Sequence, residues 1–139
     1  IYFSSGQTFF SYNLLNGKLN WEQKLSAVGT PIIDKSNIFL ITENGFFIIL
    51  NKDNGKIISS NNILKILKEK NQTTKITGYI MGSGKIYSVT RNGYLLISSA
   101  SSGKTESYKK LAKSISVSPI INDNMLFILT ENSKIIGLN

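Results

Sequence analysis

The stretch Pro-Ile-Ile-Asp-Lys-Ser-Asn-Ile-Phe at residues 31–39 decides the fold, because it recurs twice in the same register. Its counterparts are Tyr-Ile-Met-Gly-Ser-Gly-Lys-Ile-Tyr at residues 79–87 and Pro-Ile-Ile-Asn-Asp-Asn-Met-Leu-Phe at residues 119–127. The offsets are 48 and 88 positions, and each copy is followed at the same distance by a Thr-x-Asn-Gly or Thr-x-Asn-Ser turn. A repeat of roughly 40 residues built from short apolar runs indicates propeller blades or stacked β units. The sequence therefore predicts an all-β fold.

Each repeat is predicted to contain four antiparallel strands, which we call A to D in chain order. Asn-Gly at residues 44–45 and 92–93 is among the strongest short-range hairpin signals, and a Gly-Lys turn leads into each strand D. Strand A is expected at residues 31–34, 79–82 and 119–122, strand B at 37–42, 85–90 and 125–130, and strand C at 46–51, 94–99 and 134–139. The residues before 31 are predicted to form strands B, C and D at 1–5, 7–13 and 17–25.

This order of strands predicts that residues 1–139 are a fragment of one β-propeller, an incomplete arc of about three and a half blades. Because the pattern starts on strand B and stops on strand C, we expect an internal or C-terminal piece of a longer protein. We also expect exposed sheet edges and a tendency to associate when the chain is produced alone. The predicted units are a partial blade at 1–25, a full blade at 29–60, an insertion at 61–74, a full blade at 76–109 and a partial blade at 116–139.

The insertion is predicted to form a short amphipathic helix capped by Asn62. Two interpretations are open: its apolar side packs back on the propeller, or it docks a protein partner on the face that carries the D–A connections. The apolar residues, spaced i, i+1, i+3 and i+4, are Ile63, Leu64, Ile66 and Leu67.

Composition excludes several chemistries. The chain has no cysteine and no histidine, so it has no thiolate ligand, no disulfide and no imidazole base. Its net charge is +8, but all except one of the basic residues are lysines scattered singly, which does not indicate a nucleic-acid surface. No run approaches the roughly 18 apolar residues that a membrane-spanning helix needs.

The segment Ser-Tyr-Asn-Leu-Leu-Asn-Gly-Lys-Leu-Asn-Trp at residues 11–21 resembles the tryptophan-docking motif Ala-x-Asp-x-x-Thr-Gly-Lys-x-x-Trp of quinoprotein-type β-propellers. Two later copies have Ser59 and Ser107 at the tryptophan position. The motif implies a structural role, with the indole covering the gap between adjacent blades. The residues that match the repeat motif, including the two prolines that open A strands, are Asn13, Gly17, Lys18, Trp21, Pro31, Asn51, Gly55, Lys56, Gly103, Lys104 and Pro119.

The resemblance implies two branches of function. Quinoprotein dehydrogenases bind pyrroloquinoline quinone with a Ca²⁺ ion, which needs clustered oxygen ligands. The sequence has no Asp-x-Asp or Glu-x-Asp cluster, so we assign no catalytic, cofactor-binding or metal-binding residue. The carboxylates are dispersed: Glu22, Asp34, Glu43, Asp53, Glu69, Glu106, Asp123 and Glu131.

The other branch is that of BamB, whose propeller is a non-enzymatic scaffold for protein–protein contact in outer-membrane protein assembly. Similarity to this branch implies no cofactor, a periplasmic location with outer-membrane anchoring in the full-length protein, and a protein partner in the barrel assembly machinery. The remaining blades of the same propeller are a further expected partner. The alternative is a fragment of a quinone-dependent dehydrogenase with its cofactor site outside this chain. A third hypothesis, a polysaccharide or small-ligand binder, rests on Tyr79 and Tyr94.

Overall fold

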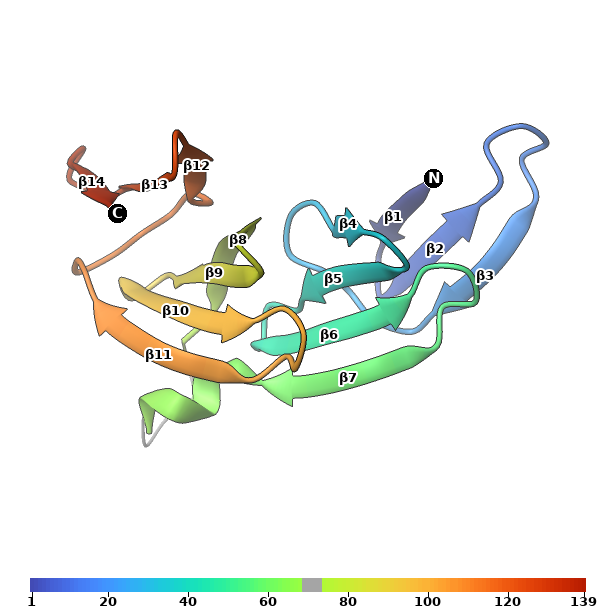
Figure 1. Ribbon diagram of the computed structural model, residues 1–139, viewed down its shortest axis with the longest axis horizontal. Helices are drawn as coiled ribbons and strands as arrows, with labels where there is room; N and C mark the ends of the chain where they lie inside the picture. The colour runs from blue at the N-terminus through green and yellow to red at the C-terminus, as the bar shows by residue number, and fades with distance from the viewer. Residues whose placement is uncertain (69–73) are drawn as a thin grey trace.

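The computed structural model describes residues 1–68 and 74–139, and these residues form an arc of four antiparallel β-sheets (Figure 1). The predicted fold class is confirmed: two four-stranded sheets lie between two three-stranded ones, and the arc does not close. The first sheet contains β1 (Tyr2–Ser5), β2 (Thr8–Tyr12) and β3 (Leu19–Gln23), and the second contains β4 (Ile32–Asp34), β5 (Asn37–Ile41), β6 (Phe46–Asn51) and β7 (Ile57–Asn62). The third contains β8 (Ile76–Gly82), β9 (Lys85–Thr90), β10 (Tyr94–Ser99) and β11 (Thr105–Lys110), and the fourth contains β12 (Ile120–Asn122), β13 (Met125–Leu129) and β14 (Ile135–Leu138).

Each sheet is a meander in which consecutive strands pair. The chain therefore passes from the innermost to the outermost strand of one sheet and then crosses to the innermost strand of the next. Strands β4, β8 and β12 lie on the inner side of the arc, and β7 and β11 lie on its outer side (Figure 1). A two-residue turn joins each inner strand to the next strand of the same sheet. Ser83 and Gly84 both have positive φ, as do Asp123 and Asn124, which is the backbone of a type I′ hairpin and matches the twist of the strands.

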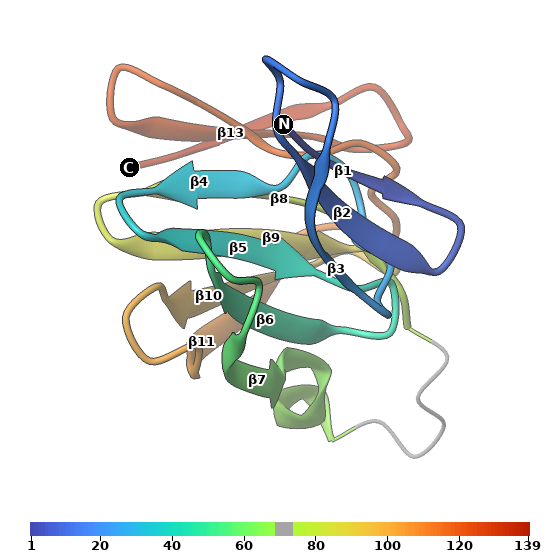
Figure 2. The ribbon, with the colours of Figure 1, turned by 90° about the vertical axis from the view of Figure 1, so that its right-hand side faces the viewer.

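The core consists of three apolar contacts, one between each pair of neighbouring sheets. Strand β5 shows how the sequence builds them. Ile38 and Leu40 pack against the first sheet, whereas Phe39 and Ile41, on the opposite face, pack against the third. Successive side chains of a strand point to opposite faces, so an unbroken apolar run is what a strand buried on both sides requires. The view in Figure 2 shows the sheets stacked one behind another.

Several predicted bounds differ from the structure. Strand β8 begins at Ile76, so Tyr79 lies within the strand and does not open it as predicted. Strand β7 continues to Asn62, two residues past the predicted end of its blade, and β11 continues to Lys110. Both strands are longer because they pair with their neighbours up to the first residue of each, Asn62 opposite Phe46 of β6 and Lys110 opposite Tyr94 of β10. Residues 69–73 of the predicted insertion lie outside the described residues.

The insertion has a defined start and end in the hydrogen-bonding pattern. The amide of Ile63 donates to the carbonyl of Gly45, and 48 residues later Leu111 donates to Gly93, both at 2.9 Å. At the far end of each connection, the amide of Ile76 donates to the carbonyl of Glu43 and the amide of Ile115 donates to that of Arg91, both at 3.1 Å. The connection from the second to the third sheet is therefore nine residues longer than the connection from the third to the fourth. The helix within it, η1 (Ile63–Leu67), is a 3₁₀ helix. None of the described helical residues forms a helix long and apolar enough to cross a membrane.

Candidate functional site and interaction surfaces

The repeat motif builds a tight loop between the last two strands of a sheet. In the first copy, the side-chain oxygen of Asn13 accepts hydrogen bonds from the amides of Leu15 (2.9 Å) and Asn16 (3.3 Å). The amide of Gly17 donates to the carbonyl of Asn13 at 2.9 Å, and the φ of this glycine is +69°. Asparagine is suited to this position because its side chain replaces backbone acceptors, and glycine because its φ is positive.

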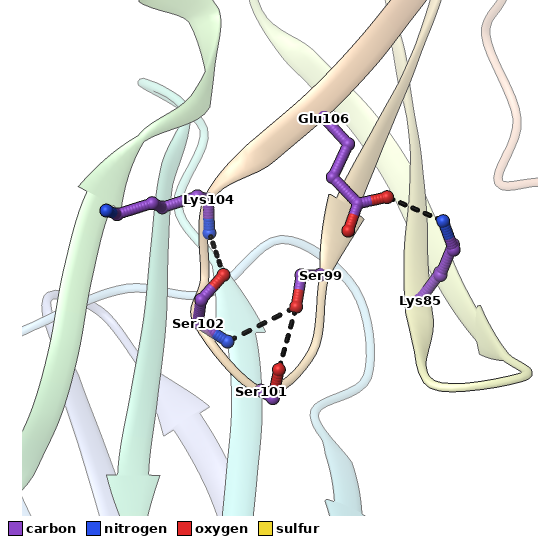
Figure 3. A network of polar contacts seen from close by, with 6 residues as sticks. All are labelled: Lys85, Ser99, Ser101, Ser102, Lys104 and Glu106. Atoms are coloured by element: carbon purple, nitrogen blue, oxygen red, sulfur yellow. Dashed lines mark hydrogen bonds and ion pairs between the residues drawn. The ribbon is translucent and has the colours of Figure 1, made fainter.

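The other two copies repeat this geometry. Asn51 accepts from Asp53 and Asn54 at 2.9 and 3.1 Å, and the φ of Gly55 and Gly103 is again +69°. In the third copy a serine replaces the asparagine, and the hydroxyl of Ser99 accepts from the amide of Ser102 at 3.3 Å (Figure 3). The lysine after each glycine, Lys18, Lys56 or Lys104, is exposed. The motif positions in the loops thus have a backbone role.

Trp21 connects the first sheet to the loop of the second. Its indole nitrogen donates to the carbonyl of Lys52 at 3.1 Å, and its ring lies directly over Gly55. A Cβ added to Gly55 would be 2.5 Å from the ring carbons of Trp21. Two positions later, the amide of Gln23 donates to the carbonyl of Gly55 at 2.8 Å. An aromatic ring and an amide from one sheet therefore hold the loop of the next.

Strand β7 of the second sheet contacts the loop of the third sheet through polar groups. Ser59 stands where the first copy has Trp21, and its hydroxyl lies 3.5 Å from the carbonyl of Ser102. Asn61 stands where the first copy has Gln23, and its amide nitrogen lies 3.4 Å from the same carbonyl and 2.8 Å from the Ser59 hydroxyl. A Cβ on Gly103 would meet both side chains at about 3 Å. Asn61 was not among the predicted motif residues, although its offset of 38 from Gln23 would have indicated it.

The two motif prolines precede inner strands. Pro31 is partly buried just before β4, and Pro119 is buried just before β12. Next to Pro119, the backbone of Ser118 closely approaches Gly78 of β8. A Cβ on Gly78 would be 2.6 Å from the Cα of Ser118. This contact packs the connection into the fourth sheet against the third.

The predicted docking residues of the insertion are divided by burial. Ile63 and Leu64 are buried in the core between the second and third sheets, and Leu64 lies over Gly45. Ile66 and Leu67 pack against the same cluster but remain partly accessible. Asn62 caps the helix as predicted, with its side-chain oxygen accepting from the amide of Leu64 at 3.0 Å. The accessible part of η1 is therefore its second half.

The fourth sheet has one apolar face without a neighbour among the described residues. We call this set the C-terminal face: Ile120, Phe127, Leu129 and Ile135, which line one shallow groove. Ile120 is 60% exposed and Ile135 is 71% exposed. The opposite face of the same sheet, which includes Leu126 and Ile128, is buried against the third sheet.

At the other end of the arc, the first sheet also has a face that no other described sheet covers. We call it the N-terminal face: Phe3, Phe10 and Tyr12. The ring centroids of Phe3 lie 5.5 Å from those of Phe10 and 5.8 Å from those of Tyr12, the latter in a stacked arrangement. Phe3 is 40% exposed. Across the same sheet, Phe9 and Trp21 face the second sheet and are buried.

The two tyrosines of the ligand-binding hypothesis lie in different surroundings. Tyr79 is buried between the second and third sheets, and this burial raises the pKa of its phenol, an effect that its proximity to the backbone of Ile41 only partly offsets. Its hydroxyl has no hydrogen bond of good geometry within the described residues. Tyr94 packs on Tyr108, and the ammonium of Lys110 lies 4.3 Å from the centre of its ring.

Carboxylates do not gather in the described part of the chain, where no group of three or more acidic side chains could hold a metal ion. Two of them pair with lysines at the surface. Glu43 lies 3.6 Å from Lys75, and Glu106 lies 2.5 Å from Lys85 (Figure 3). The hydrogen bond and the charge of Glu106 raise the pKa of Lys85, but both groups are open to water, so the pair has little effect on stability.

Comparison with known proteins agrees with the fold. Residues 1–61 match the family model described as "Outer membrane protein assembly factor BamB", and no curated protein sequence matches the chain significantly. The crystal structure of BamB from Moraxella catarrhalis superposes with a TM-score of 0.74 and 14% identity, covering 98% of this chain and 40% of that one. The chain thus spans about two fifths of the length of that protein.

Two further structures show how widely the fold occurs. Saccharomyces cerevisiae Sqt1 superposes with a TM-score of 0.78 and 15% identity over 95% of this chain and 40% of that one. Quinohemoprotein alcohol dehydrogenase from Comamonas testosteroni superposes with a TM-score of 0.65 and 16% identity, over 78% of this chain and 19% of that one. The chain therefore has the fold of a β-propeller arc. Its residues 1–61 are similar to the BamB family, and its fold is similar to that of BamB.

Proposed function

We propose that this chain is part of a non-enzymatic propeller scaffold that mediates protein–protein contact in the bacterial cell envelope, as in BamB-like outer-membrane protein assembly. The observation that carries the proposal is the match of residues 1–61 to the BamB family model. These residues include Trp21 and Gly55, whose contact holds the first sheet against the loop of the second. This contact in the matched region supports the role of a rigid scaffold.

The proposed partner is a protein of the barrel assembly machinery, and the proposed location is the periplasm, with outer-membrane anchoring of the full-length protein. The proposed contact region is the insertion, through Ile66 and Leu67 of η1. Ile63 and Leu64 support it from below, because their burial fixes the orientation of the helix. Protein–protein interfaces have an apolar centre surrounded by a polar rim, and Ile66 and Leu67 lie beside the exposed Lys65 and Lys68. We further propose that the remaining blades of the propeller cover the two free sheet faces.

The experiment is direct binding between the purified full-length protein and the periplasmic domains of the barrel-insertase subunit from the same organism. We expect measurable affinity in titration calorimetry, and a loss of roughly tenfold or more when Ile66 and Leu67 are both changed to Asp. Leu15→Asp is the matched control, since Leu15 is 97% exposed in a loop away from η1. Absence of binding by the unaltered protein would reject the scaffold proposal.

The alternative function, a piece of a quinone-dependent dehydrogenase, is supported by the superposition on the Comamonas testosteroni enzyme. The described residues do not fit such a cofactor site, because their carboxylates are dispersed and two are paired with lysines. The alternative therefore requires the site to be elsewhere in the full-length protein. Incubating that protein with the quinone and Ca²⁺ and measuring dye-linked alcohol oxidation decides between the two.

A further inference from the structure

A groove lies open between the first and second sheets, beside the connection that leads from β3 to β4. Its apolar lining comes from that connection and from β6: Leu25, Val28, Phe46 and Ile48. Phe46 is 42% exposed there, although the next four residues of its strand are buried. The volume of the groove is about 880 Å³, within the range of clefts that bind ligands. Its walls belong to two neighbouring described sheets, so it differs from the uncovered faces at the two ends of the arc.

The equivalent place between the second and third sheets is filled by η1. At the offset of 48, the counterpart of Ile48 in the third sheet is Leu96. Leu96 belongs to the apolar cluster that contains Ile63 and Leu64 of η1. The helix also contacts β11, and Leu64 lies directly over Gly45. In the next repeat, an apolar helical turn of the chain itself therefore closes this position.

Two differences in sequence leave the first groove open. The connection between the first two sheets is ten residues shorter than the next one, because the offset between the repeats rises from 38 before it to 48 after it. Small polar side chains also stand at two positions that are large in the next repeat. Ser26 takes the place of Leu64, and Ser60 takes the place of Tyr108. Both serines line the groove, so the room for a helical turn is present and the turn is not.

We propose that this groove binds a single helical turn of a partner protein, with two aliphatic side chains toward the groove and a carboxylate toward Lys24. The precedent for the aliphatic side chains is η1, whose isoleucine and leucine residues pack at the same position of the next repeat. Apolar side chains of a helix laid into an apolar groove are a common mode of protein recognition. The groove does not include Ile66 or Leu67, so the inference goes beyond the contact proposed above for the barrel assembly machinery.

The charge at the groove favours an acidic partner. Lys24, which lines the groove, is exposed and forms no salt bridge with any described residue. Glu43 lines the wall formed by the second sheet, but its carboxylate already lies 3.6 Å from Lys75. The chain as a whole has a net charge of +8. A carboxylate on the partner therefore meets an unpaired lysine, and charge complementarity of this kind contributes to specificity and to the rate of association.

The first test uses the purified, isotopically labelled full-length protein in a nuclear magnetic resonance titration. The probe is the peptide Asn-Ile-Leu-Glu-Ile-Leu-Glu, which is the segment 62–68 with both lysines changed to glutamate. We expect saturable binding with a dissociation constant of roughly 0.1–1 mM, and amide shift changes at Thr8, Lys24 and Phe46. Ser60→Trp should raise the dissociation constant roughly tenfold or more, because the indole would fill the groove. Ser60 is exposed, so this variant should fold normally.

The second test concerns the charge. Lys24→Glu should weaken binding of this peptide roughly threefold or more, and it should strengthen binding of the peptide that keeps both lysines. Lys56→Glu is the matched control, because Lys56 is also exposed and lies outside the groove. Shift changes centred on η1 and β11, no saturation at millimolar peptide, or unchanged affinity in Ser60→Trp or Lys24→Glu would overturn the proposal. None of these outcomes depends on the barrel insertase, so failure of the groove and failure of the scaffold function are distinguishable.

Discussion

Replacing Gly55 by Ala should reveal how much the docking of Trp21 contributes, because the chain contains its own control. Gly17 and Gly55 occupy the same loop position with the same φ of +69°. An alanine in this left-handed conformation costs about 1–2 kcal/mol. Nothing lies within 4 Å of the Cβ position at Gly17, whereas at Gly55 the ring of Trp21 is 2.5 Å away. The difference between the two variants therefore isolates the contact between the sheets.

The indole cannot easily move away from a new methyl group. It is 9% exposed, its ring lies 5.9 Å from that of Phe9 between centroids, and its nitrogen donates to the carbonyl of Lys52. Overpacking of a filled contact typically costs 1–3 kcal/mol. We expect Gly17→Ala to lose about 1–2 kcal/mol of unfolding free energy. Gly55→Ala should lose about 2–5 kcal/mol when both costs apply.

Urea unfolding followed by circular dichroism gives the two free energies. Trp21 is the only tryptophan, so its fluorescence also reports the contact directly: emission should shift to longer wavelength in Gly55→Ala and not in Gly17→Ala. In a Trp21→Ala background, the cost of Gly55→Ala should fall to that of Gly17→Ala. Equal losses in the two single variants, or an extra cost at Gly55 that persists without the indole, would refute this account.

Three other changes follow from close contacts or missing partners. Gly78→Ala should cost about 1–3 kcal/mol in urea unfolding, because its methyl group would meet the backbone of Ser118, and a neutral result would contradict this packing. Asn62→Ala should cost about 1 kcal/mol through loss of the cap on the Leu64 amide, with Asn62→Asp as a control that keeps the acceptor. Tyr79→Phe should be neutral or stabilising by up to about 1 kcal/mol, since the buried hydroxyl has no well-formed hydrogen bond. Burial raises the pKa of Tyr79, so the folded state keeps a proton that the unfolded state releases. The free energy of unfolding should therefore fall as pH rises through about 10, and it should fall less steeply in Tyr79→Phe. Parallel pH profiles of the two proteins would contradict this.

Much of the fold could be predicted because the repeat is expressed in local chemistry. Each hairpin has turn residues of the required type, and the strands between them are short runs of apolar and β-branched residues. The capping role of Asn62 was likewise predictable, since a cap acts on the backbone two residues away. The predicted strand ends were less accurate: β8 starts at Ile76, which pairs with Thr90 of β9 and also donates to the carbonyl of Glu43 in the second sheet.

The candidate surfaces were less predictable, because burial depends on which sheet lies opposite. The sequence shows Ile63, Leu64, Ile66 and Leu67 as one apolar set, and only packing against the third sheet separates the buried pair from the accessible pair. The docking of Ser59 on the loop of Gly103 also depended on packing, since a small polar side chain stands there in place of the indole of Trp21.

The sequence by itself determined the repeat, the strand order within each blade and the loop glycines, because turn conformations and alternation of side chains are properties of neighbouring residues. The tertiary structure alone decided which apolar faces are covered. Phe47 and Ile135 occupy equivalent positions in the repeat, yet Phe47 is fully buried and Ile135 is 71% exposed. Among the described residues the third sheet covers Phe47 and no sheet covers Ile135, and burial is a property of contacts between distant parts of the chain.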